Sequence, residues 1–332
     1  WGAPSAAAAH PPAGDVTIVA SGGDALGTTW TVNAGVLVTT AASASVDAAT
    51  VVGYLASGAL TIEANTIRVA ASLTSATASD LTLKALRNVT VDPGVAIETA
   101  GGDVIVWADS DADRAGGIRV GDDFAGVFTT AIRTNGGDIV LSGGSDPVDG
   151  FASYDSALGE AFSVYQYAVG VFGALLDASA SADPGGNIVI RGNAGDTFNG
   201  VIWTVQIGGQ YGANTTVKTN GEGSITILAD ASEAPANPVA NNSRNPWAAV
   251  IVGTVETESG DISLIGASNV ARSNARGLVI GAPVQSGSGT IRVEDRTANT
   301  DDGNYTGPFI NGAQFGKGTL PASSSDIVFS HN

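Results

Sequence analysis

Residues 134–144 read TNGGDIVLSGG, and close copies of this stretch recur along nearly the whole chain. Each copy has a turn, often followed by Asp or Asn, and then Ile, Val or Leu at alternating positions. The other copies are GGDVIVWAD, GGNIVIRGN, GEGSITILAD, ESGDISLIGA, GSGTIRVED and SSSDIVFSHN. Alternation of this kind predicts β-strands with one buried face. Self-similarity along a chain predicts a repeat architecture, in which each unit contacts only its neighbours.

The spacing of the copies predicts the size of one repeat. Gly58 and Ser79 are 21 residues apart, and Ser79 and Gly102 are 23 residues apart. These distances match one coil of a three-sided β-solenoid. The 44 residues from Gly14 to Gly58 are then two coils, and residues 32–53 supply strand-like material for a degenerate middle copy.

Stacked coils would align matching residues in two interior columns, which would form the core. In the quoted stretch, Ile139 and Leu141 share one face of the strand, whereas Asp138 and Val140 share the other. The interior pairs of the other copies are Val104 and Val106, Ile188 and Ile190, Ile225 and Ile227, Ile262 and Leu264, Ile291 and Val293, and Ile327 and Phe329. We therefore expect an all-β fold, a parallel β-helix (β-solenoid) of about ten coils, roughly 50 Å long at ~4.8 Å per coil.

Polar insertions follow the first strand of most coils, so we expect them to leave the rod at one edge. Residues 1–13 read as an Ala/Pro-rich tail, and residues 14–332 as a single β-solenoid domain whose longest insertion covers about residues 144–170. Within that insertion, residues 156–168 suit a short helix with Ser156 or Asp155 near a cap, although their aromatic and β-branched residues suit strands as well. Insertions on one face of a repeat protein are often its binding face.

The charge and composition exclude several function classes. The chain has 32 acidic and 14 basic residues, a formal net charge of −18 at pH 7. Nucleic acid binding depends on Lys and Arg that neutralise phosphates, so this excess of acid argues against it. No apolar run is long enough to cross a bilayer, and we expect no membrane insertion. The chain contains no Cys, which excludes a disulfide framework.

The order of strands and loops within one repeat resembles that of a known kind of repeat. GNIVIRG is followed by the polar stretch NAGDTFNG, the apolar strand VIWTVQIGG and the corner NTTVKTNGEG. Over roughly residues 14–331, this layout resembles the shaft repeats of very large bacterial exoproteins of the filamentous-haemagglutinin and adhesin type. The resemblance implies a right-handed parallel β-helix. It also implies an exported bacterial protein, extracellular or at the cell surface, that acts as a rod, an adhesin or a matrix protein.

One acidic stretch has the alternation of a calcium-binding loop. An EF-hand is excluded, because Arg114 stands where that loop has its Gly and Val120 where it has its Glu. A looser calcium site and a solvated acidic loop both remain open. Residues 301–304 are a weaker candidate of the same kind, for which an ordinary turn is the alternative. The residues of the candidate calcium site are Asp109, Asp111, Asp113, Asp122 and Asp123.

The residue types needed for catalysis are sparse, and we expect no enzyme. The chain has three Lys, far apart, and two His, His10 and His331, each near one end. A β-helix polysaccharide lyase or hydrolase needs clustered carboxylates, either with a basic partner or as a pair at a set separation. It remains the second alternative. The first alternative is an adhesin whose loop face binds glycans or a host protein, for which exposed Trp and Tyr in the insertions would be the sign.

The two ends of the chain suggest self-association. Ile327 and Phe329 lie in an ordinary repeat strand at the carboxy end, and the amino end offers only WGAPSAAAAHPPAG, so neither end shows a cap. Open sheet edges template further strands, and a head-to-tail contact that does not close generates a filament. We therefore expect copies to associate end to end, with Trp1, Ile327 and Phe329 at the contact. The expected function is a structural protein of the cell surface or extracellular matrix, as a subunit or segment of a filament.

Overall fold

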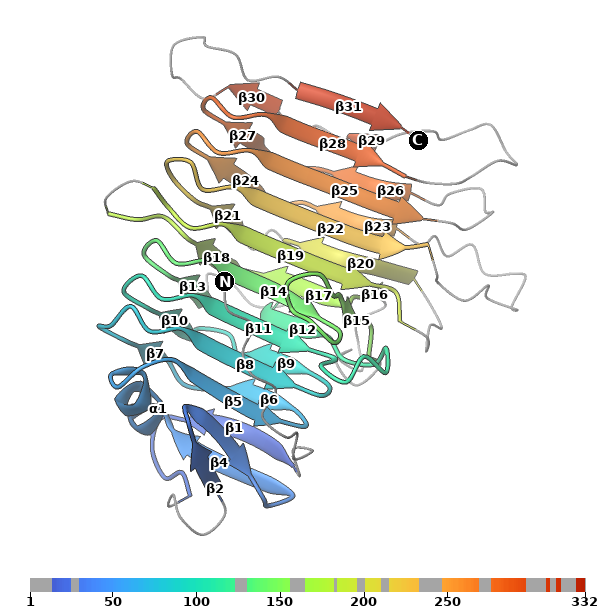
Figure 1. Cartoon of the computed structure of the whole chain (residues 1–332). Helices are drawn as coiled ribbons and strands as arrows, with labels where there is room; N and C mark the ends of the chain where they lie inside the picture. Colours follow the sequence, from blue (N-terminus) through green and yellow to red (C-terminus); the bar gives the residue numbers. More distant parts are fainter. Residues whose placement is uncertain are drawn as a thin grey trace, which may run out of the picture.

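A computed structural model describes the fold of most of the chain (Figure 1). The described residues are 14–24, 30–122, 130–155, 165–181, 184–195, 201–209, 215–232, 247–268, 276–296, 309–310, 315–317 and 327–331. Within them, the regular secondary structure is β-strand, with a single helix, α1 (Ala48–Leu55). The strands form three sheets, here named A, B and C. Within each sheet, the strands follow one another along one common axis, which makes a stack.

Sheet B faces the viewer in Figure 1 and carries the repeated motif of the sequence. In spatial order its strands are β2 (Trp30–Asn33), β3 (Val36–Thr39), β5 (Leu60–Ala64), β8 (Leu81–Ala85), β11 (Val104–Ala108), β14 (Ile139–Gly143), β19 (Ile188–Asn193), β22 (Ile225–Ala231), β25 (Ile262–Ser268), β28 (Ile291–Asp295) and β31 (Ile327–His331). A short strand, β15 (Ala152–Ser153), also pairs with β19.

Sheets A and C supply the other two sides of the stack. Sheet A runs β4 (Ser43–Asp47), β1 (Asp15–Val19), β6 (Ile67–Val69), β9 (Val89–Val91), β12 (Ile118–Gly121), β17 (Val169–Phe172), β20 (Val201–Ile207), β23 (Trp247–Ile251), β26 (Arg276–Ile280) and β29 (Phe309–Ile310), and β16 (Tyr165–Gln166) pairs with β20. Sheet C runs β7 (Leu73–Thr74), β10 (Ala96–Glu98), β13 (Thr130–Arg133), β18 (Ala174–Asp177), β21 (Thr216–Lys218), β24 (Thr254–Thr257), β27 (Val284–Ser286) and β30 (Phe315–Lys317). All strand pairs among the described residues are parallel except β2 with β3 and an isolated bridge between Gly116 and Ser153.

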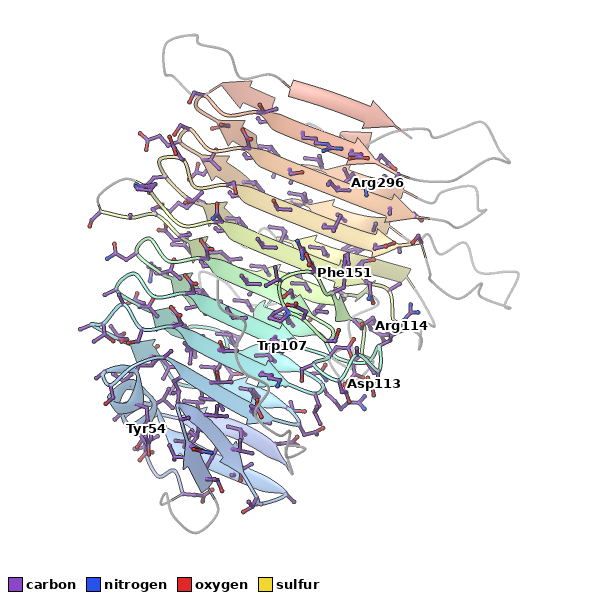
Figure 2. The ribbon with its side chains drawn as sticks, in the orientation of Figure 1. Tyr54, Trp107, Asp113, Arg114, Phe151 and Arg296 are labelled. Atoms are coloured by element: carbon purple, nitrogen blue, oxygen red, sulfur yellow. The ribbon has the colours of Figure 1, made fainter. Side chains whose placement is uncertain are left out.

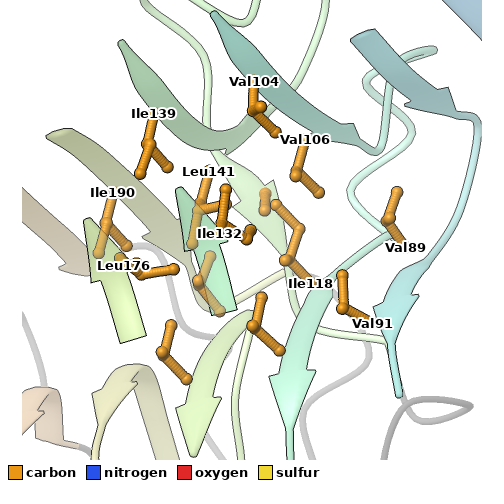
Figure 3. Packing of buried hydrophobic residues seen from close by; sticks show 14 of the residues in the cluster. Val89, Val91, Val104, Val106, Ile118, Ile132, Ile139, Leu141, Leu176 and Ile190 are labelled. Atoms are coloured by element: carbon orange, nitrogen blue, oxygen red, sulfur yellow. The ribbon is translucent and has the colours of Figure 1, made fainter. Parts of the chain in front are cut away.

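The register of sheet B confirms the predicted interior columns. Val104 pairs with Ile139, and Ile139 pairs with Ile188. The same column continues through Ile225, Ile262, Ile291 and Ile327, and the second runs from Val106 to Phe329. The aliphatic side chains of three sheets meet in one continuous core, part of which Figure 3 shows. Complete burial of one Val, Leu or Ile side chain stabilises a fold by about 1.5–3 kcal/mol, so each coil adds several such contributions.

Two sets of hydrogen bonds explain why the motif contains Thr134, Gly137 and Asp138. At the corner between sheets C and B, the Thr134 hydroxyl donates to the Gly137 carbonyl. The Asp138 carboxylate accepts the backbone N–H of Asn187 on the next coil at 2.7 Å, and Asp103 accepts that of Asp138 at 2.7 Å. Coils approach so closely here that a Cβ on Gly137 would lie 2.4 Å from the carbonyl oxygen of Gly102. Gly and Asp therefore recur because every coil crosses the same corner.

The long insertions connect strands of sheet B to strands of sheet A, as their position after the first strand of each coil predicts. The structure describes residues 109–117 and 144–155 of these connections. Residues 156–164, 196–200, 233–246, 269–275 and 297–308 lie outside the described residues. The helix predicted for residues 156–168 is wrong at Tyr165–Gln166, which form β16, because Tyr165 and Gln166 pair with Val201 and Ile202 of β20.

The amino-proximal end differs from the prediction. In place of a further coil, β2 and β3 form an antiparallel hairpin, and residues 48–55 form α1. The helix forms because Ala48, Val51 and Leu55 share one face, which is buried against the stack. The expectation that this end has no cap is therefore wrong. The tail, residues 1–13, lies outside the described residues.

Candidate functional site at the corner between sheets B and A

The acidic stretch forms the turn that joins β11 of sheet B to β12 of sheet A. We name residues 109–117 the corner turn. Its backbone is fixed to the preceding coil, because the Asp109 N–H donates to the Arg87 carbonyl at 3.1 Å and the Ser110 N–H to the Ala85 carbonyl at 3.0 Å. Asp109 and Arg114 adopt left-handed backbone conformations, with φ of 51° and 68°. Such conformations are uncommon outside Gly and are most readily adopted by Asn and Asp.

The Asp109 carboxylate is buried and accepts three hydrogen bonds from the protein. One oxygen accepts the backbone N–H groups of Arg114 at 3.0 Å and Ala115 at 3.4 Å. The other accepts the Ser153 hydroxyl at 2.5 Å. Burial raises the pKa of Asp109 to about 6, although these three hydrogen bonds act in the opposite direction. This side chain therefore ties the corner turn to the segment around β15.

Asp111 and Asp113 are exposed, and each contributes a carboxylate near that of Asp109. One oxygen from each of the three residues lies within 4.8 Å of the others. Asp113 also accepts the Ala115 N–H at 3.0 Å. Figure 2 shows Asp113 beside Arg114 at the edge of the stack. Three carboxylate oxygens are a ligand set that suits calcium, which takes six to eight oxygens.

A second buried carboxylate, Asp155, joins the segment after β15 to the preceding coil. It accepts hydrogen bonds from Arg87 at 2.9 Å and from the Asn88 amide at 2.9 Å. The hydrogen bond to Asp155 raises the pKa of Arg87, and the nearby Asp113 and Asp111 add to that effect. The side-chain Oδ1 of Asn88 accepts the Gly117 N–H at 2.8 Å.

Tyr154 beside Asp155 is 2% exposed, and burial with the charge of Asp155 raises its pKa to about 12. The Gly116 and Ser153 backbones bridge, with the Ser153 N–H donating to the Gly116 carbonyl at 2.8 Å. Ser153 is thus hydrogen-bonded to the corner turn near both of its ends, at Asp109 and at Gly116. Residues 87, 88 and 153–155 were not predicted to belong to this site, since residues 87 and 155 are 68 positions apart and only the stacking of coils brings them together.

The structure does not bring all the predicted calcium ligands together. Asp122 follows the far end of β12, at the corner with sheet C, and is not part of the carboxylate group at the corner turn. A four-residue strand of ~13 Å separates the two ends of β12. Asp123 and residues 301–304 lie outside the described residues.

Two of the three predicted self-association residues, Ile327 and Phe329, lie at one end of the stack. Ile327 and Phe329 are in β31, opposite Ile291 and Val293 of β28. Trp1 lies outside the described residues.

Exposed Trp in the insertions would be the sign of a glycan-binding adhesin, but Trp107 lies in β11 and its surroundings are structural. It lies on the outer face of sheet B, where its indole N–H donates to the Gly144 carbonyl at 2.6 Å and Lys84 sits 4.8 Å from the ring centre (Figure 2). Trp30 and Trp203 are 6% and 4% exposed. The described Trp side chains therefore pack within the protein, which is the arrangement expected of structural aromatic residues.

The corner turn and residues 153–155 can hold two coils and an insertion together, and their carboxylates can bind a hard cation. The chain matches no family model, no curated protein and no solved structure. Among the described residues, no helix is long and apolar enough to cross a membrane.

Proposed function

We propose that the chain is a right-handed parallel β-helix of about ten coils. In the described part of the chain, the order sheet B, sheet A, sheet C occurs eight times: β5–β6–β7, β8–β9–β10, β11–β12–β13, β14–β17–β18, β19–β20–β21, β22–β23–β24, β25–β26–β27 and β28–β29–β30. The strands β1 to β4 precede these circuits, and β31 follows them. The hand of the helix comes from the resemblance of the repeat to shaft repeats and from the right-handed preference of parallel crossover connections.

We further propose a structural role, as a self-associating rod that is a subunit or segment of a filament at the cell surface or in the extracellular matrix. The observation that carries this proposal is the continuity of the two interior columns, which run in register from β11 to β31. A column that stays in register over many coils makes a long, uniform body. The hydrogen bonds of the acidic corner are made to the protein itself, which also favours a structural role over a catalytic one.

Calcium enters this proposal as a structural cofactor of the corner turn. A bound cation would use Asp111 and Asp113, whose exposed carboxylates repel one another, together with the oxygens of Asp109. The net charge of −18 adds a general reason for a rod of this kind to bind cations.

Electron microscopy of the purified chain at several concentrations, with and without a calcium chelator, tests the proposal. We expect rods that associate as concentration rises. Loss of association in the presence of chelator would show that calcium has a structural role. Single rods under every condition would contradict self-association, and compact round particles would contradict the rod.

A further inference from the structure

The outer face of sheet C, on the left side of the stack in Figure 1, carries charges that alternate in sign from one coil to the next. The alternation lies at one outward position of each strand, next to a core residue. The Arg133 side chain is 41% exposed, for example, whereas its neighbour Ile132 is fully buried. Over five successive coils, the residues at this position are, in register, Glu98, Arg133, Asp177, Lys218 and Glu256. We name these five residues the charge ladder.

Within one chain, neighbouring members of the charge ladder form ion pairs. Nη1 of Arg133 lies 2.6 Å from Oε1 of Glu98, and Nζ of Lys218 lies 3.3 Å from Oδ2 of Asp177. Opposite charges on neighbouring strands favour the observed register. Ion pairs as exposed as these are weak, because water competes for both partners. The charges of the ladder therefore remain able to interact with charges on a surface that faces them.

The second outward row of sheet C is uncharged. In register, it consists of Ala96, Ala131, Leu175, Thr216 and Thr254. Stacked sheets pack ~10 Å apart, face to face. Side chains of this size, beside the charge ladder, permit another sheet to approach to that distance.

The outer faces of sheets A and B suit a second copy less well. In sheet A, the residues Val169–Phe172 of β17 and Trp203–Ile207 of β20 are buried on both faces of the strand, so the outer face is already covered there. In sheet B, successive coils place Asp80, Asp103 and Asp138 in one row, which would bring like charges of two copies together. The net charge of −18 opposes association in general. On sheet C, opposite charges can offset that repulsion.

A two-fold axis parallel to the strands, between β18 and β21, brings sheet C of two copies face to face over its whole length. These two strands are the middle pair of the eight in the sheet. The axis reverses the direction of the rod and keeps each row of residues opposite itself. β18 then lies opposite β21 of the second copy, β13 opposite β24, β10 opposite β27 and β7 opposite β30. Such a contact is isologous, the usual form in homodimers.

At this full overlap, no charge of the ladder faces a charge of its own sign. The facing pairs, each formed twice, are Asp177 with Lys218, Arg133 with Glu256, and Glu98 with the uncharged Gln285. A shift of one coil in either direction places acid against acid. Parallel rods with opposed ladders would place each charge against itself. The order of the signs therefore selects the antiparallel arrangement with full overlap.

We propose that sheet C is a lateral contact between two antiparallel copies of this chain, in which the two charge ladders face each other. The contact goes beyond the end-to-end association proposed above and does not depend on it. Eight strands of two to four residues make a face of roughly 350 Å², against ~800 Å² per partner in a stable interface. We therefore expect the copies to associate at high protein concentration and low salt, and to separate when salt screens the charges.

Cross-linking of single-Cys variants of the full chain tests this arrangement, because the chain has no Cys of its own. The probe is a bismaleimide that spans the sheet spacing of ~10 Å. Leu175 lies in β18, next to the axis, so Leu175→Cys should give a cross-linked dimer at low salt and none in about 1 M salt, where the Debye length is ~3 Å. Ala96 lies in β10, and the axis places its two copies roughly 24 Å apart along the rods, so Ala96→Cys should give none. Thr82→Cys, on the outer face of sheet B, measures the background.

Charge reversal tests the part played by the ladder. In the Leu175→Cys chain, Lys218→Glu places an acid opposite Asp177 of the second copy and should abolish the cross-link. Addition of Asp177→Lys makes the facing pair opposite again and should restore it. Lys84→Glu is the matched control and should leave the cross-link unchanged, because Lys84 forms a comparable ion pair on sheet B, 3.0 Å from Glu63, and its reversal changes the net charge equally.

A melting curve of each variant checks that it folds. If Lys218→Glu does not fold, Glu256→Lys repeats the test, because it places a base opposite Arg133 of the second copy. Cross-linking by Ala96→Cys as strong as by Leu175→Cys, no cross-link above background at any concentration, or an equal loss with Lys84→Glu would overturn the inference.

Electron microscopy separates this inference from the proposed end-to-end association, because lateral contact changes the width of an assembly and end-to-end contact its length. Short paired rods with the Leu175→Cys cross-link would support the inference while contradicting the end-to-end association. Long filaments of single-rod width without that cross-link would overturn the inference and leave the end-to-end association standing.

Discussion

Replacement of Asp109 by Asn removes the buried titrating group of the corner turn while keeping its shape. The Asn carbonyl oxygen can accept the N–H groups of Arg114 and Ala115, and its amide can donate to the hydroxyl oxygen of Ser153. Asp109 is 1% exposed, so no solvent compensates the charge of the wild-type carboxylate. The substitution therefore isolates the cost of ionising this carboxyl group inside the protein.

The sign and size of the effect follow from the pKa. Burial raises the pKa of Asp109 from an ordinary value of 3.8 to about 6, so the folded protein holds this proton more tightly than the unfolded chain. The stability due to the proton is fully present below pH 3.8 and is lost as pH rises through about 6. One pKa unit corresponds to 1.36 kcal/mol, so the loss is about 3 kcal/mol at neutral pH.

Urea unfolding of wild type and Asp109→Asn, at intervals between about pH 4 and about pH 7, measures this difference. We expect the variant to gain about 2 to 3 kcal/mol in free energy of unfolding relative to wild type across that range. Asp111→Asn is the control, because Asp111 is exposed and its replacement should show a much smaller pH dependence. A difference between Asp109→Asn and wild type that stays constant with pH would refute the reasoning.

Three further predictions concern the corner and the core. Thr134→Val leaves the buried Gly137 carbonyl without its hydroxyl donor and should lower the free energy of unfolding by about 1–3 kcal/mol, measured with urea. Gly137→Ala places a Cβ against the Gly102 carbonyl and should cost about 1–3 kcal/mol in the same assay, and an unchanged midpoint would show that the coils are further apart than described. Leu141→Ala should cost about 2–5 kcal/mol because Leu141 is fully buried, whereas Val140→Ala on the outer face should cost much less, and equal losses would contradict the assigned faces.

The interior of the stack could be predicted from the sequence because the alternation of apolar residues that marks it is visible within each short strand. Alternation in a strand of five residues fixes which side chains face inward, and repetition of the motif fixes which strands match. The register of Ile139 with Ile188 needed no other information. The recurring Asp was visible as well, but its partner, the backbone N–H of the next coil, became clear only from the register.

The hairpin β2–β3 and helix α1 at the amino-proximal end, and the contacts of the corner turn, could not be predicted in the same way. Residues 32–53 contain Val, Thr and Ala in proportions that suit strand or helix, and their outcome depends on being the end of the stack, where α1 covers β7. Asp155, with Ser156 as the alternative, was interpreted as a helix cap from its neighbours. Its actual partners, Arg87 and Asn88, are separated from it by more than two coils of sequence, although stacking places them in contact.

The central claim is that successive copies of the motif stack as parallel coils in register, and engineered disulfides test it most directly. The chain has no Cys, so any bridge must come from the introduced pair. Thr61 and Thr82 are paired on adjacent coils, and parallel neighbours ~4.8 Å apart lie within the 4.4–6.8 Å Cα range of a disulfide. We predict that Thr61→Cys with Thr82→Cys forms a bridge on oxidation, and that Thr61→Cys with Lys84→Cys does not. Bridging by the second pair in preference to the first would contradict the register and the stack built on it.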